Sequence, residues 1–247
     1  VCCDKGLVVI DVSHPPKPKV VSVIEQGINM PRSVEVQFQY GFLCDKDGVK
    51  ILDTTDISKP KLITTVPLAD AKNIYVARTY AYVSAGHQGL VILDVKNPTK
   101  PVIDQVYNAG GKISDLHDVQ LGITNVSAFA YLADGHNGFH VVQLTNANRP
   151  DNNGFSPRPL PELIASYALP HHGSALSISK GIDRDRAVDE SGNQIAVFGR
   201  IGARPLNRLE ENIYLRNGLP WRVSNDPFDS DIFIIEPDAN IPPVLQR

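Results

Sequence analysis

The histidines of this 247-residue chain are its strongest candidates for binding a metal ion or another ligand. His87 and His136 occupy the same place in two similar turns, residues 85–89 and 134–138. Imidazole is a common metal ligand and titrates near neutral pH, and carboxylates can add oxygen ligands. The candidate ligand or metal face therefore comprises His87, His117, Asp118, Asp134, His136, His171 and His172.

A second interpretation of these histidines needs no ligand. Polar hairpin turns accept histidine, and duplication of a repeat would copy the residue from one turn to the next. Spacing does not decide between the two, because ligands would come from separate repeats and no His-x-His or His-Glu-x-x-His motif is present. A metal ion, a haem edge and an anionic ligand all stay open as occupants of this face.

The cysteine spacing and the missing enzyme motifs limit the reactions and cofactors expected of this chain. Cys2, Cys3 and Cys44 form no Cys-x-x-Cys-His motif, so this chain attaches no c-type haem covalently. Cys2 and Cys44 share one repeat position, which is compatible with a disulfide, with buried apolar packing or with a partner outside this segment. The Gly-x-Ser-x-Gly elbow and the phosphate-binding glycine loops are absent from the sequence. A non-enzymatic protein is favoured, although a catalytic site gathered from several repeats would leave no local motif.

Composition excludes two classes of partner. The chain has 24 Lys and Arg against 27 Asp and Glu, a net charge of -3, unlike a basic nucleic-acid-binding surface. No apolar run approaches the roughly 18 residues that span a bilayer. The 18 glycines and 19 prolines separate short apolar runs, which is typical of strands joined by turns. We therefore expect a folded all-β protein without a membrane span.

The elements that position the histidines come from an internal repeat. A glycine, an apolar run and an aspartate recur at residues 6–11, 48–53 and 89–94, with the aspartates 42 and then 41 residues apart. A degenerate copy at 138–143 ends 49 residues later. The glycine follows a tight hairpin, and the aspartate can accept backbone N–H bonds in the next turn. The predicted structural residues of the repeat are Gly6, Asp11, Gly48, Asp53, Gly89, Asp94 and Gly138.

Each period contains four strand-like segments. They are residues 73–77, 80–84, 89–95 and 101–107 in the third copy, and 118–121, 130–133, 138–144 and 162–167 in the fourth. A four-stranded unit of about 40 to 45 residues has the size of one β-propeller blade, which stacks on its neighbours to bury both faces. We expect five blades, at about 1–26, 27–67, 68–107, 108–169 and 170–247, the last with an insertion at about 181–227.

The repeat register makes the first and last blades incomplete. Residue 1 falls in a second strand, and the chain stops inside a fourth strand. Ring closure normally pairs strands from the two ends, because an open edge leaves backbone groups unpaired. We therefore expect one propeller domain over 1–247, or a fragment of a larger ring. Two regular blades in place of the interrupted last one is the competing interpretation.

Residues 81–98, with the run Gly-Leu-Val-Ile-Leu-Asp at their centre, resemble the LVIVD repeat of bacterial and archaeal surface proteins. The resemblance covers residues 1 to about 169 and is weakest at Gln143, where the family has Asp. It implies a β-propeller at the cell surface, outside the cell or in the periplasm, that presents a rigid face to protein partners. The alternatives are a redox-linked protein with metal or haem at the histidine face, and a hydrolase or lyase propeller.

Overall fold

The computed structural model describes residues 1–179, apart from 15, 124–126, 147, 150–151 and 153–155, together with 215–216 and 219–220. The chain divides into two compact units, Val1–Lys180 and Gly181–Arg247. In the second unit, β16 (Leu215–Arg216) pairs with β17 (Leu219–Pro220). The rest of the predicted fifth blade beyond residue 179, and of its insertion, lies outside the described residues.

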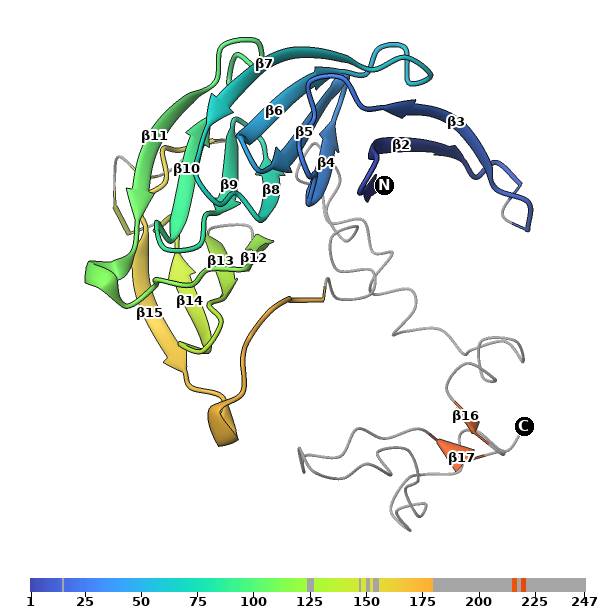
Figure 1. Cartoon of the computed structure of the whole chain (residues 1–247). Helices are drawn as coiled ribbons and strands as arrows, with labels where there is room; N and C mark the ends of the chain where they lie inside the picture. Colours follow the sequence, from blue (N-terminus) through green and yellow to red (C-terminus); the bar gives the residue numbers. More distant parts are fainter. Residues whose placement is uncertain are drawn as a thin grey trace, which may run out of the picture. The chain divides into compact units, whose positions relative to one another are not determined.

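The first unit consists of four successive antiparallel sheets, which we number as blades 1 to 4 (Figure 1). Blade 1 contains β1 (Cys2–Cys3), β2 (Gly6–Asp11) and β3 (Lys19–Ile24); blade 2 contains β4 (Ser33–Gln37), β5 (Tyr40–Asp45), β6 (Gly48–Asp53) and β7 (Lys61–Pro67). Blade 3 contains β8 (Asn73–Ala77), β9 (Tyr80–Ser84), β10 (Leu90–Asp94) and β11 (Val102–Tyr107); blade 4 contains β12 (Asp118–Ile123), β13 (Ala128–Ala133), β14 (Phe139–Gln143) and β15 (Glu162–Tyr167).

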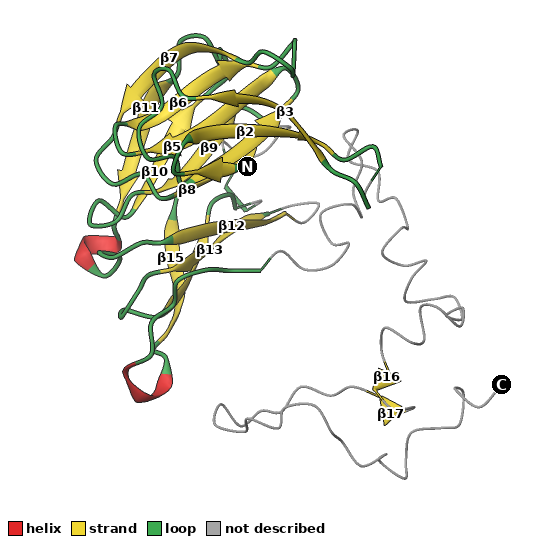
Figure 2. Ribbon diagram, turned by 45° about the vertical axis from the view of Figure 1, so that its right-hand side comes forward, coloured by secondary structure: helices red, strands yellow, loops and turns green. Residues whose placement is uncertain are grey.

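Within each blade every strand pairs with the strand before it, so the chain runs outward from the innermost strand to the outermost. The innermost strand β8 contacts both β4 and β12, which brings the inner edges of blades 2, 3 and 4 together. Helix is confined to two 3₁₀ turns in the described part, Ala109–Gly111 and Pro170–His172 (Figure 2). The predicted all-β architecture of propeller blades is confirmed.

The apolar core lies between neighbouring blades. Alternate strand residues point to opposite faces of a sheet, so each blade contributes one set of side chains to the blade before it and another to the blade after it. Blades 2 and 3 bury Phe42, Ile51, Val83 and Leu93 together, and blades 3 and 4 bury Tyr82, Leu90, Leu121 and Leu132. Because both faces of each inner blade are covered, the blades stabilise one another.

Every blade has a β-bulge in its outermost strand. The register between the third and fourth strands shifts at the same place each time and leaves one residue of the fourth strand unpaired. These residues are Val21, Ile63, Asp104 and Ile164. A bulge twists an edge strand and discourages pairing with another edge.

The connection between β14 and β15, together with the start of β15, reaches back onto blade 3. Arg158 Nε lies 3.0 Å from each carboxylate oxygen of Asp104, the bulged residue of β11. Gln105 Nε2 donates to the Pro159 carbonyl at 2.8 Å, and Leu163 N donates to the Tyr107 hydroxyl at 2.7 Å. These contacts cover the outer edge of β11.

Candidate functional site: the crossover face

One face of the blades is formed by the turns between second and third strands together with the segments that cross from one blade to the next. We call it the crossover face. Gly86, in the turn of blade 3, exchanges two backbone hydrogen bonds of 3.1 Å with Leu116, which precedes β12. Gly135, in the turn of blade 4, exchanges bonds of 2.9 and 2.8 Å with Ala175. Each turn is therefore fixed to the segment that leads out of its own blade.

His87 and His136 are exposed in these turns, and each contacts the next crossing segment. His87 Nδ1 lies 2.8 Å from the Ser114 carbonyl oxygen. A carbonyl only accepts, so Nδ1 carries the hydrogen, and Nε2 of the neutral ring keeps its lone pair. His136 Nδ1 lies 2.9 Å from the Ser174 hydroxyl. Each of the two equivalent histidines thus contacts the crossing segment that follows its blade, His87 at a backbone carbonyl and His136 at a serine hydroxyl.

His117 lies between an acid and a base. Its Nε2 is 3.1 Å from Asp115 Oδ1 and 3.2 Å from Lys72 Nζ. One ring nitrogen cannot donate and accept at once, so Nε2 either accepts from Lys72 or donates to Asp115. Burial raises the pKa of Asp115, but the nearby His117 and Lys72 outweigh it, and the net effect lowers that pKa.

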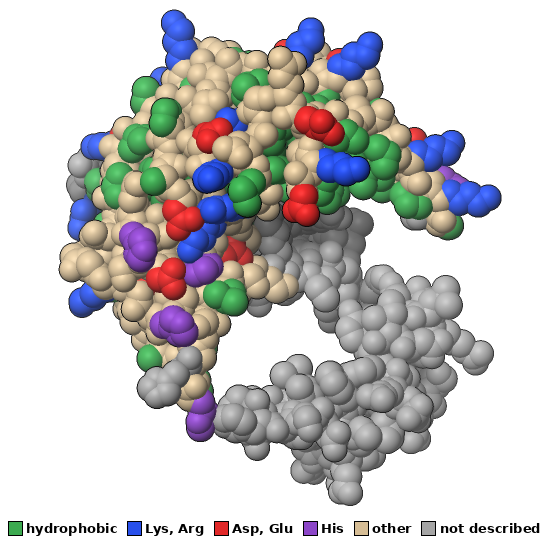
Figure 3. All heavy atoms as spheres, viewed as in Figure 1, with side chains coloured by type: hydrophobic (Ala, Val, Ile, Leu, Met, Phe, Trp, Pro, Cys, Tyr) green, Lys and Arg blue, Asp and Glu red, His purple; other side chains and the backbone are tan. Residues whose placement is uncertain are grey.

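Basic and acidic side chains alternate along the crossing segments. Arg32, Lys72 and His117 occupy equivalent positions in blades 2, 3 and 4. The backbone N–H of each donates to a carbonyl at the end of the second strand of its blade, either the last residue or the one before it. Arg32 Nη1 lies 2.7 Å from Asp70 Oδ1 of the next blade, and Lys72 Nζ lies 3.4 Å from Asp115 Oδ1 of the blade after that. Figure 3 shows histidine, basic and acidic side chains interspersed on one face.

Asp118 and Asp134, the predicted oxygen ligands, are buried and already bonded. Asp118 accepts from the Asn73 side-chain amide and, at 2.7 Å, from Ile178 N. Asp134 accepts from Asp115 N at 2.7 Å, from Ser114 N at 3.2 Å and from Asn137 Nδ2 at 2.9 Å. Both carboxylates tie crossing segments to the blades.

The predicted ligand residues differ in their burial and do not line one common site. His87 and His136 are exposed in the turns, His117 is half-buried, and the two aspartates are buried. His171 lies in the Pro170–His172 turn with a φ of 54°, and His172 follows it. Among the residues that the structure describes, no group of three or more His, Cys, Asp or Glu side chains is placed to hold a metal ion. The metal hypothesis therefore draws no support from their geometry.

Sequence reasoning missed a buried network that includes His140. His140 Nε2 lies 3.3 Å from Asp134 Oδ2, and its Nδ1 lies 2.8 Å from the Ser166 hydroxyl. Asp134 and His140 are buried, whereas Ser166 on β15 is exposed. This is the connectivity of a Ser–His–Asp triad, although the serine meets Nδ1 rather than Nε2.

The other blades explain this network. In blade 2 the equivalent positions hold Asp45 and Lys50, whose side chains are buried and 3.3 Å apart. In blade 3 they hold Ala85 and Val91, both buried. Where the first of these two positions holds an acid, the second holds a base. Where the first is apolar, as in blade 3, the second is apolar as well. The pattern is that of a buried charge and its compensating partner. Aligning the repeats on their glycines places Lys50 and His140 together, which is the signal that could have revealed it.

The three cysteines are all free, so the Cys2–Cys44 disulfide considered from the sequence is not formed. Cys44 is buried between blades 2 and 3, and Cys2 packs against the cluster between blades 1 and 2. Cys2 and Cys44 therefore both pack as apolar side chains.

The four-stranded sheets and their interleaved cores define a β-propeller. The family model described as LVIVD repeat matches residues 1–24 and 69–109, so these two segments carry LVIVD repeats. No curated protein matches the chain. Among solved structures, the N-terminal domain of Nup159 is similar with 10% identity and a TM-score of 0.36, over 60% of this chain and 33% of that one. This chain thus spans about a third of that structure. No helix in the described ranges is long and apolar enough to cross a membrane.

Proposed function

We propose that this chain is a non-enzymatic β-propeller module for binding and assembly that presents its crossover face to a protein partner. The observation that carries the proposal is the fixed position of the exposed His87 and His136. The turns that hold them are joined to the crossing segments by paired backbone hydrogen bonds. A surface ordered before binding loses little conformational entropy when a partner docks.

The chemistry of the face fits a protein partner. Its ion pairs, such as Arg32–Asp70 and Lys72–Asp115, balance charge locally, so no strong field of one sign favours nucleic acid. Exposed imidazoles on fixed turns offer both donors and acceptors, which suits the polar rim of a protein interface. Location outside the cell, at its surface or in the periplasm, is part of the same proposal and rests on the resemblance of the repeats to those of surface proteins.

Site-specific photo-crosslinking tests the proposal. A photo-reactive amino acid replaces His87 or His136 in the full chain, expressed in cells of its source, and a matched control replaces Thr99, exposed in the turn between the third and fourth strands of blade 3. We expect the same discrete protein adduct from positions 87 and 136 and none from position 99. Equal adducts from all three positions, or none at 87 and 136, would contradict a docking role for the crossover face.

A fluorophosphonate probe distinguishes this proposal from a hydrolase. Such probes label a serine only when a neighbouring base activates it. Because Asp134 and His140 occupy the positions of a structural pair in blade 2, we expect no labelling of Ser166. Stoichiometric labelling that His140→Lys abolishes would instead assign catalysis to this network.

A further inference from the structure

Charged side chains form a continuous line along the segments that enter blades 2, 3 and 4. Asp70 lies between two bases, with Oδ1 2.7 Å from Arg32 Nη1 and Oδ2 3.6 Å from Lys72 Nζ. Asp115 also lies between two bases, with Oδ1 3.4 Å from Lys72 Nζ and 3.1 Å from His117 Nε2. The line therefore contains two aspartates, an arginine, a lysine and a histidine.

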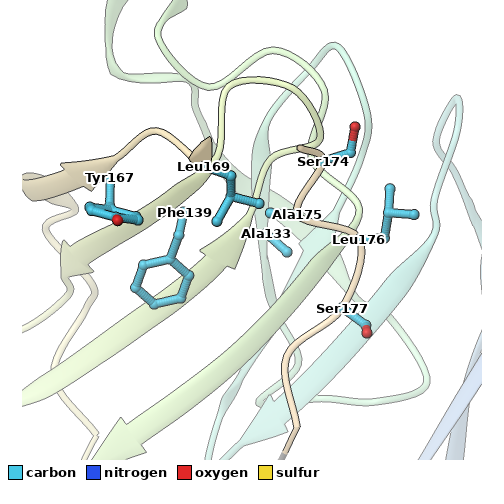
Figure 4. A pocket seen from close by; sticks show the side chains of 8 residues that line it. All are labelled: Ala133, Phe139, Tyr167, Leu169, Ser174, Ala175, Leu176 and Ser177. Carbon is cyan, nitrogen blue, oxygen red and sulfur yellow. The ribbon is translucent and has the colours of Figure 1, made fainter. Parts of the chain in front are cut away.

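The repeat places Ser174 where Asp115 lies one blade earlier. Leu116 exchanges backbone hydrogen bonds with the turn of blade 3, and Ala175 exchanges the same bonds with the turn of blade 4. The residues that precede them, Asp115 and Ser174, are therefore equivalent. Figure 4 shows Ser174 next to Ala175 on the segment that leaves blade 4. A serine hydroxyl carries no charge, so the alternation of acids and bases stops before this segment.

His117 is thus the base of the line that has no acid on the following segment. Arg32 meets Asp70 there, and Lys72 meets Asp115. Within the described part of the chain, the ion pair of His117 is with Asp115, the acid of its own segment. Lys72 already shares that carboxylate.

Two buried carboxylates close to His117 are bonded in other directions. Asp118 accepts from Ile178 N at 2.7 Å. Asp134 Oδ2 lies 3.3 Å from His140 Nε2. Among the ion pairs of the described residues, neither carboxylate is paired with His117. These two acids therefore leave His117 to the line of charged side chains.

Protonation of His117 changes both its bonds and the charge of the face. The neutral ring can accept from Lys72, whereas the protonated ring donates to Asp115 and repels Lys72. Burial raises the pKa of Asp115, but His117 and Lys72 outweigh it and lower that pKa, so Asp115 stays ionised where imidazoles titrate. Two acids then meet three bases, and one positive charge is uncompensated.

The acids of the line also lie against the turns that hold His87 and His136. A Cβ at Gly86, which precedes His87, would collide with Asp70 Oδ2. A Cβ at Gly135, which precedes His136, would collide with the next acid of the line. The two exposed imidazoles therefore belong to the same surface, and their protonation adds to its positive charge.

We propose that protonation of His117 makes the crossover face a docking site for an acidic segment of its protein partner. The argument is charge complementarity, because the line is balanced while His117 is neutral and has one positive charge in excess when His117 is protonated. A carboxylate of the partner takes the place that Ser174 leaves without an acid. The proposal rests on the proposed function and adds the charge of the partner and the pH dependence of docking.

Fluorescence anisotropy of a labelled deca-aspartate peptide, titrated with the full chain at low ionic strength, tests the docking site. The peptide stays ionised between about pH 5.5 and about pH 7.5. We expect its dissociation constant to be about tenfold or more lower at the acidic end of this range. His117→Gln, which cannot gain the proton, should lose most of this pH dependence. His14→Gln is the matched control, because His14 is exposed in the turn at the opposite end of blade 1.

Nitrogen NMR of the histidine rings in the wild type makes the test independent of any variant. We expect His117 to gain its proton over the same pH range in which the peptide affinity rises. A His117 ring that stays neutral, an affinity that does not change with pH, or an equal loss of pH dependence in His14→Gln would overturn the proposal. Photo-crosslinking at positions 87 and 136 decides the proposed function separately. Adducts at those positions together with pH-independent peptide binding would overturn this proposal and keep the proposed function.

Discussion

Asp134 shows how the choice of one buried residue constrains its neighbours. A carboxylate at this position accepts bonds from the crossing segment and fixes it, and a base must then compensate the buried charge. In blade 2 the buried carboxylate pairs with Lys50, and in blade 4 it pairs with His140. In blade 3 the equivalent residues are Ala85 and Val91, and no compensation is required.

Substitutions that copy one blade into another test this interpretation. We expect Asp134→Ala alone to cost about 3–5 kcal/mol of unfolding free energy, because it leaves His140 without its acid and the crossing segment without its acceptor. His140→Lys, which copies blade 2, should cost about 1 kcal/mol. The double change Asp134→Ala with His140→Val copies blade 3 and should recover much of the loss. Urea unfolding measures all three.

The result that contradicts this interpretation is additivity. If the double variant loses the sum of the single losses, acid and base are not coupled, since coupled neighbours deviate from additivity. Val142→Ala in the same strand is a useful reference for a purely apolar loss at this interface.

Cys44 should be unreactive in the folded protein. Burial raises the pKa of its thiol to about 12, and only the thiolate is the nucleophile. Cys3 is exposed and free. With iodoacetamide at pH 8 we expect rapid modification of Cys3, and modification of Cys44 only after denaturation, as read by peptide mass spectrometry. Equal rates at both sites in the native protein would show that the interface between blades 2 and 3 opens readily.

The histidine set illustrates what sequence can predict at this scale. Repeat alignment placed His87 and His136 in equivalent turns, and both contact the next crossing segment, although His87 meets a backbone carbonyl and His136 a serine hydroxyl. It could not show that Asp134 is turned inward, because the direction of a side chain depends on the packing of its neighbours. The pairing of Asp134 with His140 joins two strands and has no local motif.

At the level of elements, the turn after the third strand is built around one aspartate in blades 1, 2 and 3. Asp11, Asp53 and Asp94 accept a bond of 2.8–2.9 Å from the backbone N–H two residues further on. For Asp53 the hydrogen bonds from Thr55, first its side chain and then its backbone N–H, hold the carboxyl pKa below its usual value. The same turn recurs because the same spacing of aspartate and proline recurs.

These turns predict a specific response to acid. A lowered folded-state pKa gives stability that is fully present above the ordinary carboxyl pKa, about 4, and is lost as pH falls through the lower folded value. We expect the unfolding free energy to fall with pH in this window, with a shallower slope for Asp53→Ala than for the wild type. Urea titrations at several pH values measure it. Identical slopes would mean that the turn does not bind protons differently on folding.

Gly48 is the glycine on which one hairpin most clearly depends. Its φ is 139°, and a Cβ there would lie 2.2 Å from the Val66 carbonyl oxygen. We expect Gly48→Ala to destabilise the protein by about 3 kcal/mol, since the residue cannot relax without breaking its pairing with β7. Gly110→Ala is the matched control, because its φ is also positive, at 69°, but no atom lies within 4 Å of the added Cβ. If Gly48→Ala and Gly110→Ala lost equal thermal stability, the loss would come from the positive φ alone and not from the close contact with Val66.

Strand positions were predictable because apolar periodicity and turn residues are local signals. The strands predicted in the third and fourth copies agree with β8 to β15 apart from their ends. The repeated bulges were not predictable, because a register shift depends on how two strands pair. The return of Arg158 to Asp104 joins residues 54 positions apart and could not be read from either segment.

As a whole, the described propeller unit is a stack of blades with its core between them. Its stiffness follows from that arrangement, since each inner blade is covered on both faces and each turn on the crossover face of blades 3 and 4 is tied to the next crossing segment. A repeat of this kind specifies a scaffold, and the residues that differ between blades specify what it binds. Under the proposed function, His87, His136 and the alternating charges are the residues of the crossover face that a partner contacts.

The affinity of the protein that crosslinks at position 87 tests the central claim most directly. Isothermal titration calorimetry compares the wild type, the double variant His87→Asp with His136→Asp, and the control Lys59→Asp, which changes the turn at the opposite end of blade 2. We predict a dissociation constant about tenfold or more higher for the double variant and unchanged within about twofold for the control. Equal weakening by Lys59→Asp, or unchanged binding by the double variant, would contradict a crossover-face binding module.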